Sequence, residues 1–266
     1  MKLTNELDNN QLMSFVLMIA ETSDKIALKY FRNKSLEILN KSDSSPVTIA
    51  DTEIEKHIRN KITASYSDHS IIGEEMDDVI NQSDYKWYID PIDGTSSFIS
   101  GKPVFTTLIA LTKKNKPIIS LISQPYLNER FYSNGQKSYF NDQIIQTSKI
   151  KELNQAILST TSPAFFNQAE LDRFTKVAKE TKYQKHNGYF TGGDAYQYAM
   201  LACGHIDIVV EAGLKPHDFL SLVPIITNAG GIITDWNGDE ITTKSDGRII
   251  ACANRDLHES VLKLLK

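Results

Sequence analysis

Two carboxylates and one hydroxyl, those of Asp90, Asp93 and Thr95, lie close together in the sequence. The aromatic and apolar residues before them favour a strand, and Pro91 predicts that this strand ends near Asp90, because proline donates no hydrogen bond to a sheet. Gly94 allows the backbone to approach a ligand closely. We therefore expect a rigid turn that holds both aspartates beside the hydroxyl.

Two carboxylates held this close repel each other unless a cation lies between them. No histidine or cysteine stands beside them, so the available ligands are hard oxygens, which Mg²⁺ prefers. An acidic turn that only caps the next element is the simpler alternative, because aspartate is common in turns. The other acids of the chain favour the metal site.

Further candidate acids stand at the ends of predicted elements. Asp51 and Glu55 are spaced to share one face near the start of a helix, where an acid can also serve only to satisfy the helix dipole. A short apolar strand ends in Glu74 and Glu75, and strand ends are favoured places for catalytic groups, although we expect Glu75 in a solvated loop. Asp218 begins a later helix. The candidates supply carboxylates for two or more Mg²⁺ ions and a hydroxyl for a nucleophilic water: Asp51, Glu74, Asp90, Asp93, Thr95 and Asp218.

The first half of the chain, about residues 1–150, predicts two helices on an antiparallel or mixed sheet. Apolar residues at helical spacing indicate a long helix over residues 7–31, and residues 47–51 lead into a second helix. Between them, segment 40–46 is polar, and it is either a plain connector or a mobile lid over a phosphate site with Lys41 as its cation. Two hairpins follow, with strands at 104–112, 117–124, 130–132 and 138–140.

The second half, about residues 151–266, alternates strands with helices and predicts an α/β arrangement. Gly192 and Gly193 open a helix whose N-terminal amides could hold an anion, with Asp194 as its cap. Another helix begins at residue 216 and ends at the glycines of 229–231, and Pro224 inside it should bend it. The remaining predicted strands are 156–160, 206–211, 232–234 and 248–251. The helix after Gly193 spans 195–202, and the remaining helices are 168–180 and 257–265.

The composition is that of a globular protein without nucleic-acid or membrane partners. The 266 residues are 41% hydrophobic and 23% charged, with a net charge of -4, which provides no overall basic surface for a nucleic acid. The longest apolar runs are too short to cross a bilayer, and the first residues carry acids in place of a basic signal region. Cys203 and Cys252 lack ligand-like spacing and predict buried, reduced thiols, so a cytoplasmic location is expected.

The acidic segments together resemble those of the inositol monophosphatase-like family of Mg²⁺-dependent phosphatases. The resemblance rests on residues 73–75, on residues 90–95, and on Asp218 ahead of 229–231, and it includes the pattern over 41–51. It implies one phosphatase domain over residues 1–266, an α/β (α+β) fold that forms a layered α/β/α/β/α sandwich of the inositol monophosphatase and fructose bisphosphatase type, and a homodimer. The sequence departs from the family pattern at His217, where many members carry Trp or Tyr, and at Ser221 and Leu222, where a small residue is usual.

The resemblance also implies a role for each candidate residue. Two or three Mg²⁺ ions are expected, one held by Glu74, Asp90 and the Ile92 carbonyl and a second held by Asp90, Asp93 and Asp218. Thr95, assisted by Asp51, would orient and deprotonate the attacking water. The amides of Gly94 and Thr95 would bind the phosphate, and Asp93 would also contact the substrate.

Several segments resemble the histidinol-phosphate phosphatase branch more closely: 98–103, 105–108, 160–163, 194–199 and 214–224. Histidinol phosphate carries an ammonium and an imidazole, so acids that face the leaving group would favour it over a neutral polyol. Asp194 and Glu211 are the candidates for that contact. Asp194 could instead only cap a helix, and Glu211 could form a salt bridge at a strand end.

Two other functions stay open. An inositol monophosphatase or an adenosine bisphosphate nucleotidase would use the same chemistry on another small phosphorylated metabolite. A non-catalytic protein that binds the transcription machinery is the alternative of a different class, and it predicts degraded metal ligands or a basic face, neither of which the sequence shows.

Overall fold

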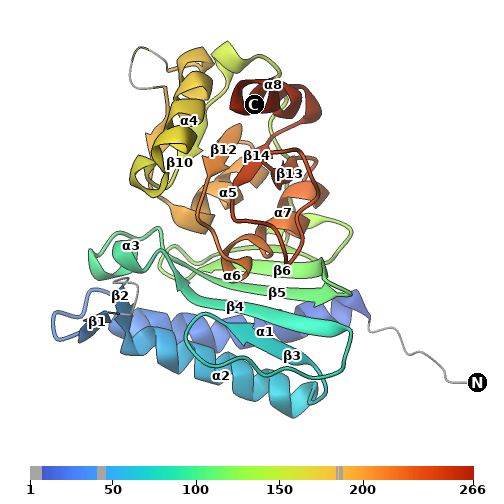
Figure 1. Cartoon of the computed structure of the whole chain (residues 1–266). Helices are drawn as coiled ribbons and strands as arrows, with labels where there is room; N and C mark the ends of the chain where they lie inside the picture. Colours follow the sequence, from blue (N-terminus) through green and yellow to red (C-terminus); the bar gives the residue numbers. More distant parts are fainter. Residues whose placement is uncertain (1–7, 41–45, 184, 186–187) are drawn as a thin grey trace, which may run out of the picture.

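The computed structural model describes residues 8–40, 46–183, 185 and 188–266, and these residues form five layers (Figure 1). The order is two helices, a seven-stranded sheet, a layer of helices, a five-stranded sheet and two further helices. This order confirms the predicted α/β/α/β/α sandwich. Lys41 and the core of the predicted lid lie outside the described residues.

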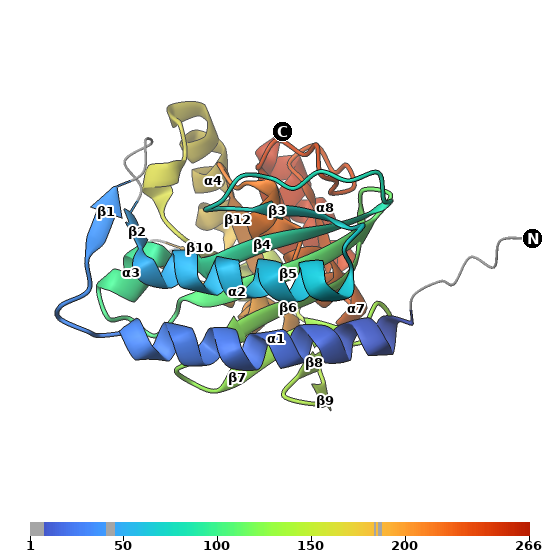
Figure 2. The same ribbon diagram turned by 90° about the horizontal axis from the view of Figure 1, so that it is seen from below.

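The seven-stranded sheet carries the first half of the site. Its strand order is β3-β4-β5-β6-β7-β8-β9, with β3 parallel to β4 and the other neighbours antiparallel, so the sheet is mixed as predicted. Helices α1 (Asn9–Tyr30) and α2 (Ile49–Ser65) cover its outer face (Figure 2). Both predicted hairpins are present, and the short strand β9 was not predicted. The strands are β3 (Ser70–Gly73), β4 (Tyr85–Asp93), β5 (Thr106–Lys113), β6 (Lys116–Gln124), β7 (Glu129–Ser133), β8 (Ser138–Phe140) and β9 (Gln143–Ile144).

Three short elements accompany this sheet. Strands β1 (Ile38–Asn40) and β2 (Pro46–Thr48) pair antiparallel, and β2 leads directly into α2. Helix α3 (Thr95–Ile99) follows β4 immediately after Gly94. The start of α2 and the start of α3 therefore both belong to the region where β4 ends.

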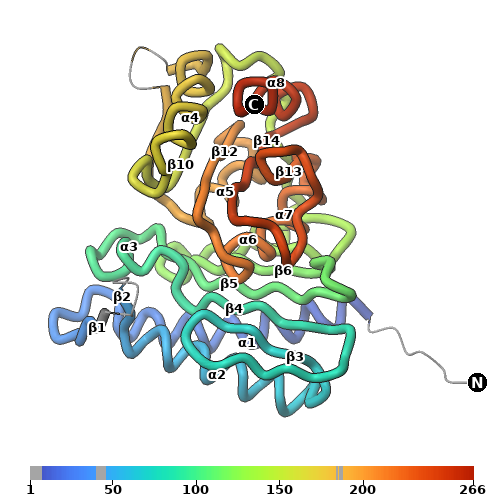
Figure 3. Tube along the Cα trace, viewed as in Figure 1, coloured from blue at the N-terminus to red at the C-terminus, as the bar shows by residue number. Residues whose placement is uncertain are grey.

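The five-stranded sheet has the order β11-β10-β12-β14-β13, in which β10 is parallel to β11 and β12 and the other pairs are antiparallel. Helices α5, α6 and α7 lie between the two sheets, and α4 and α8 cover the far face (Figure 3). The bounds are β10 (Leu158–Thr160), β11 (Phe190–Thr191), β12 (Ile208–Glu211), β13 (Ile232–Asp235), β14 (Ile249–Cys252), α4 (Gln168–Glu180), α5 (Asp194–Ala202), α6 (Pro216–Phe219), α7 (Leu222–Asn228) and α8 (Arg255–Leu265).

Strand β4 continues through Pro91 to Asp93, so the prediction that it ends near Asp90 is wrong. The register with β5 shifts between Asp90 and Asp93, and the Pro91 carbonyl accepts a hydrogen bond from Thr107 Oγ1 at 2.7 Å. A local irregularity of this kind accommodates a proline within a sheet. Residues three apart on a regular strand point to opposite faces, so the irregularity is what allows both aspartates to serve one site.

The predicted bent helix from residue 216 is two helices, α6 and α7, which are separated at Leu220 and Ser221. Pro224 does not bend a continuous helix, because it lies in the first turn of α7, where a missing N–H leaves no helical hydrogen bond unmade. The break leaves Asp218 on a short helix of its own, against β4.

Three apolar clusters hold the layers together. One lies between the outer face of the first sheet and α1 and α2, one between the two sheets, and one under α4 and α8. Cys203 and Cys252 are free thiols as predicted, but only Cys252 is fully buried. Within the described residues, no helix combines the length and the apolar character needed to cross a lipid bilayer.

A buried histidine links α2 to the first sheet. His69 stacks on Tyr66 and on Tyr85 with ring centroids 4.9 Å apart in each case, and its Nδ1 accepts a hydrogen bond from Trp87 Nε1 at 3.0 Å. That acceptor role requires an unprotonated Nδ1. Burial lowers the pKa of His69, and the nearby charge of Asp68 opposes this in part.

We therefore predict that the protein loses stability as the pH falls below about 6.5, the usual histidine pKa. Below that pH the unfolded chain binds a proton at His69, whereas the folded protein keeps His69 unprotonated. The contribution is fully present above that pH, and its loss is at most about 1.4 kcal/mol per pH unit. Denaturant titrations between about pH 7.5 and about pH 5 should show a shallower dependence for His69→Phe. The exposed His205→Asn should keep the wild-type dependence, and equal slopes for wild type and His69→Phe would contradict the prediction.

Candidate metal centre

Three carboxylates converge in the space between the two sheets. Asp90 and Asp93 come from the end of β4 and Asp218 comes from α6, and one oxygen of each lies within 4.8 Å of the others. They line a cavity of about 360 Å³, whose wall also includes Glu74 and Thr95. This arrangement offers the oxygen ligands that a divalent cation such as Mg²⁺ takes from proteins.

The electrostatics of the cluster favour a cation. Burial raises the pKa of Asp90 well above its usual value, and the charges of Glu74, Asp93 and Asp218 raise it further. Burial also raises the pKa of Asp93, next to Asp194 and Asp218. Asp90 Oδ1 is buried with no hydrogen-bond partner in the described part of the chain. A buried, unpaired carboxylate oxygen among like charges is costly, and a bound cation removes that cost, so these residues fit Mg²⁺.

The start of α5 ties Asp93 to the second half of the chain. Asp93 Oδ2 accepts hydrogen bonds from the Ala195 N–H at 2.7 Å and from Thr106 Oγ1 at 3.2 Å. The N-terminal amide of Ala195, at the predicted anion site, therefore binds the Asp93 carboxylate of the same chain. The cap of α5 is Gly193, and Asp194 is the first helical residue and makes no capping hydrogen bond, so the prediction that Asp194 caps this helix is wrong.

Asp194 faces the turn that follows β4. A Cβ atom on Gly94 would lie 2.6 Å from Asp194 Oδ2, and Gly94 has a φ of 78°. Only a residue without a side chain permits both the conformation and the approach. Burial raises the pKa of Asp194 to about 6, and the charge of Asp218 adds to the rise. Asp194 thus lies beside the acid cluster.

Asp218 is positioned by the start of its own helix. Its Oδ2 accepts a hydrogen bond from the Lys215 N–H at 2.7 Å, while Oδ1 lies 3.3 Å from His217 Nε2. Burial raises the pKa of Asp218, and the proximity of His217 opposes that rise. His217, the residue that departs from the family pattern, therefore lies directly beside the predicted metal ligand.

Asp51 and Thr95 lie at the two helix starts near the end of β4. Asp51 Oδ2 accepts from the Thr48 N–H at 2.8 Å and from Thr48 Oγ1 at 2.7 Å. Burial raises the pKa of Asp51 to about 6, and the charge of Glu74 contributes. Thr95 Oγ1 donates to the Ile92 carbonyl at 3.1 Å. The Thr95 hydroxyl therefore bonds to Ile92 and not to Asp51. A joint catalytic role of Asp51 and Thr95 stays a prediction.

Glu211 lines a smaller cavity, of about 40 Å³, which shares Asp93, Asp194 and Asp218 with the larger one. Its Oε1 accepts hydrogen bonds from the Thr161 N–H at 2.8 Å and from Gln197 Nε2 at 2.9 Å. Neutral donors, and not a cation, hold this oxygen. Burial raises the pKa of Glu211 to about 7.

Phe165 and Gln197 were not singled out from the sequence, and Gln197 lines neither cavity but bonds to Glu211. Phe165 is 63% exposed and lines both cavities. Gln197 is buried and follows Asp194 by one helical turn, a spacing that places both on one face of α5 and could have indicated its role. Nothing in the local pattern distinguishes Phe165 from other surface aromatics.

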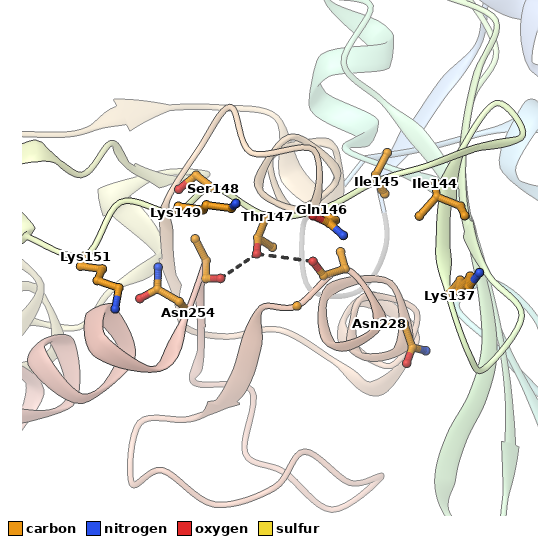
Figure 4. A pocket seen from close by; sticks show the side chains of 13 residues that line it. Lys137, Ile144, Ile145, Gln146, Thr147, Ser148, Lys149, Lys151, Asn228 and Asn254 are labelled. Carbon is orange, nitrogen blue, oxygen red and sulfur yellow. Dashed lines mark hydrogen bonds between the residues drawn. The ribbon is translucent and has the colours of Figure 1, made fainter.

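A larger cavity, of about 640 Å³, lies apart from the acid cluster, where the chain passes from the first half to the second (Figure 4). Lys137, Lys149 and Lys151 line it, and no acidic side chain among the described residues does. Thr147 Oγ1 donates to the Ala253 carbonyl at 2.7 Å, which holds the connecting segment against the second half of the chain. Its lining lacks the carboxylates that a divalent cation requires.

Comparisons with known proteins agree with this fold and site. The model of the Inositol monophosphatase family matches residues 8–266. The bifunctional phosphatase IMPL2 (chloroplastic) of Arabidopsis thaliana is 41% identical, over 98% of this chain and 78% of that protein. A histidinol-phosphatase of Chlorobaculum parvum is 31% identical, over 90% and 91% of the two chains. The solved structure of an inositol monophosphatase from Zymomonas mobilis has a TM-score of 0.87 and 34% identity, over 98% and 99%.

The layered fold and the carboxylate cluster are thus those of a phosphatase, a hydrolase that acts on phosphate monoesters. The chain belongs to the inositol monophosphatase family. The resemblance drawn from the acidic motifs is therefore confirmed. The substrates in the names of these relatives differ, so family membership does not identify the substrate of this chain.

We predict that Gly94→Ala lowers kcat/KM at least about tenfold, because the new methyl group displaces Asp194 and with it the helix start that holds Asp93. Gly192→Ala is the matched control. Gly192 has a φ of 87°, but a Cβ there meets nothing within 4 Å, so the variant carries the backbone strain of about 1 kcal/mol without the collision. Steady-state kinetics and melting temperatures of both variants separate the two effects. Equal activity losses would show that strain alone is responsible.

We also predict that Mg²⁺ stabilises the folded protein, because it offsets the repulsion among buried carboxylates. At about 100 times its dissociation constant the expected gain is about 2.7 kcal/mol, measured as a rise in melting temperature over a sodium chloride control of equal ionic strength. Asp93→Asn should lose most of the gain. Asp207→Asn, which changes a buried carboxylate outside the cluster, should keep it. No rise for the wild type would contradict the prediction.

Proposed function

We propose that this protein is a Mg²⁺-dependent phosphomonoesterase that hydrolyses L-histidinol phosphate to L-histidinol and phosphate, a step of histidine biosynthesis. The observation that carries the proposal is the convergence of Asp90, Asp93 and Asp218 in one cavity. Family membership supports the phosphatase chemistry, and the histidinol-phosphatase relative supports the substrate.

Metal binding is assigned to five residues. Glu74, Asp90 and the Ile92 carbonyl would hold one Mg²⁺, and Asp90, Asp93 and Asp218 would hold a second, of two or three in all. Phosphate monoesters hydrolyse extremely slowly unaided. The bound ions would supply positive charge that stabilises both the attacking and the leaving oxygen.

The remaining catalytic work falls to side chains at the two helix starts. Thr95 and Asp51 would orient the attacking water and accept its proton, because both lie where β4 ends and Asp51 is next to Glu74. The backbone of Gly94 and Thr95 would contact the phosphate, together with Asp93. The Asp90 carboxylate is buried, and a low local dielectric strengthens the electrostatic interactions made there.

The leaving-group side of the cavity favours a cationic substrate. Asp194 and Glu211 lie beside the acid cluster and would attract an ammonium or imidazolium group. The exposed ring of Phe165 lines the same space and would stack against a planar cation. A neutral polyol gains neither interaction.

Inositol monophosphate is the second candidate substrate, because the Zymomonas mobilis inositol monophosphatase shares this fold at 34% identity. Adenosine bisphosphate is a third. The non-catalytic alternative is disfavoured, because three acids converge in one cavity and the chain has a net charge of -4.

We further propose that both halves, about 1–150 and 151–266, act as one domain over residues 1–266, since the cluster draws carboxylates from each half. A homodimer without nucleic-acid or membrane partners, located in the cytoplasm, stays our prediction. Sedimentation of the purified protein tests the dimer.

A phosphate-release panel tests the proposed function. Purified protein is assayed with Mg²⁺ on L-histidinol phosphate, inositol monophosphate and adenosine bisphosphate, with and without a strong chelator. We expect the highest kcat/KM on histidinol phosphate and no turnover with chelator. A better kcat/KM on either other ester would overturn the substrate, and full turnover under chelation would overturn the metal.

Replacement of Glu211 tests the cationic subsite. We predict that Glu211→Gln lowers kcat/KM for histidinol phosphate about 30-fold, which corresponds to about 2 kcal/mol for a lost charge-assisted contact, and changes that for inositol phosphate less than about threefold. Glu129→Gln is the control, because Glu129 accepts from the Tyr196 hydroxyl at 2.7 Å and lines neither cavity. Equal losses on both substrates would assign Glu211 to structure.

A further inference from the structure

A buried ion pair on α2 lies under the segment that carries Glu74. Arg59 Nε donates to Glu55 Oε1 at 2.7 Å, one helical turn away. Glu55 is fully buried, and Arg59 is 7% exposed. Asp51 precedes Glu55 by the same spacing, so the three side chains share one face of the helix.

The pair bonds to the main chain of the loop after β3. Glu55 accepts from the N–H of Glu75 at 2.8 Å and from that of Met76 at 3.1 Å. Arg59 donates to the carbonyls of Met76 and Asp77, both at 2.9 Å. Because these four bonds reach backbone atoms, they determine the path of the loop directly.

Glu74 is thereby anchored on both sides. Its own N–H donates to the carbonyl of Ile89, the residue before Asp90, at 3.2 Å, and the next N–H along the chain bonds to Glu55. A Cβ atom on Gly73 would lie 2.1 Å from Glu55 Oε1, so the ion pair packs directly against the end of β3. The Glu74 side chain lies close enough to raise the pKa of Asp90.

We propose that Glu55 and Arg59 are positioning residues for the Mg²⁺ site, which hold the Glu74 carboxylate beside Asp90. This inference rests on the proposed function, which assigns Glu74 to the metal. Residues 76–80 are exposed, so apolar packing contributes little to the order of this loop. Groups that orient metal ligands without touching the metal typically change metal affinity 10- to 100-fold when they are replaced.

Two substitutions weaken the hydrogen bonds of the Glu55–Arg59 pair to the loop without leaving a large void. Glu55→Gln removes the charge and turns one acceptor into a donor that faces backbone N–H groups. Arg59→Lys keeps the charge but cannot donate to three acceptors in one planar fork. Arg59→Lys is the milder change and keeps the test available if Glu55→Gln does not fold, since a lone buried charge costs several kcal/mol.

The test is calorimetric titration of wild type and variants with magnesium chloride. We expect the Mg²⁺ dissociation constant to rise about tenfold or more in both variants. At saturating Mg²⁺, kcat should stay within about threefold and the pH–rate profile should keep its shape, because Asp51 is left in place. A purely structural pair would lower the melting temperature without this split between metal affinity and kcat.

The Asp24–Arg130 pair provides the matched control. Arg130 Nη2 lies 2.7 Å from Asp24 Oδ2, both are largely buried, and they join α1 to β7 outside the acid cluster. Arg130→Gln should lower the melting temperature and leave the Mg²⁺ dissociation constant unchanged.

The outcomes separate this inference from the proposed function. Mg²⁺ binding in Glu55→Gln and Arg59→Lys as tight as in wild type, or an equal loss in Arg130→Gln, overturns the positioning role. A wild type that binds no Mg²⁺ overturns both. Weakened binding in the two variants beside a wild type that hydrolyses none of the esters supports the positioning role and overturns the proposed function alone.

Discussion

Mutual repulsion among the clustered carboxylates of Asp90, Asp93 and Asp218 is the constraint on which the rest of the structure depends. Left to themselves, like charges this close would separate or take up protons. The fold prevents separation because each carboxylate is carried by a packed element, and two of them also accept a backbone N–H, from Ala195 and Lys215. The cluster is thereby organised before any cation arrives, which is the condition for strong electrostatic stabilisation of a transition state.

The first sheet and the helical layer between the sheets both position the clustered carboxylates. The first sheet contributes two proposed ligands through the irregular passage of β4 across Pro91, and a third acid, Glu74, which directly follows the neighbouring strand β3. The helical layer between the sheets contributes Asp218 and the N–H that holds Asp93. Glu211 and Phe165 line the cavity wall beside the cluster, so the proposed preference among phosphate esters would depend on this wall and not on the cluster.

The helices, the strands and the clustered acids were predictable from local sequence pattern. The contacts between distant segments, at Pro91 and at Asp194, were not. Helical spacing placed α1 correctly, apolar runs separated by turn residues placed both hairpins, and residue types at element ends identified the cluster. The passage of β4 through Pro91 was missed because a side-chain hydrogen bond from β5, remote in sequence, accommodates it. Asp194 was taken for a cap because its partner, the Gly94 turn, belongs to the other half. Such errors arise where tertiary contacts override local preference.

The order of the ligands along the chain has a consequence for biosynthesis. Glu74, Asp90 and Asp93 leave the ribosome long before Asp218 is made, and domains fold from the N-terminus during translation. The nascent first half therefore offers an incomplete set of ligands, with no α6 to finish it. Because tight metal binding requires the assembled set, binding of a divalent cation by the proposed ligands would mark a chain that has been made and folded at least as far as α6.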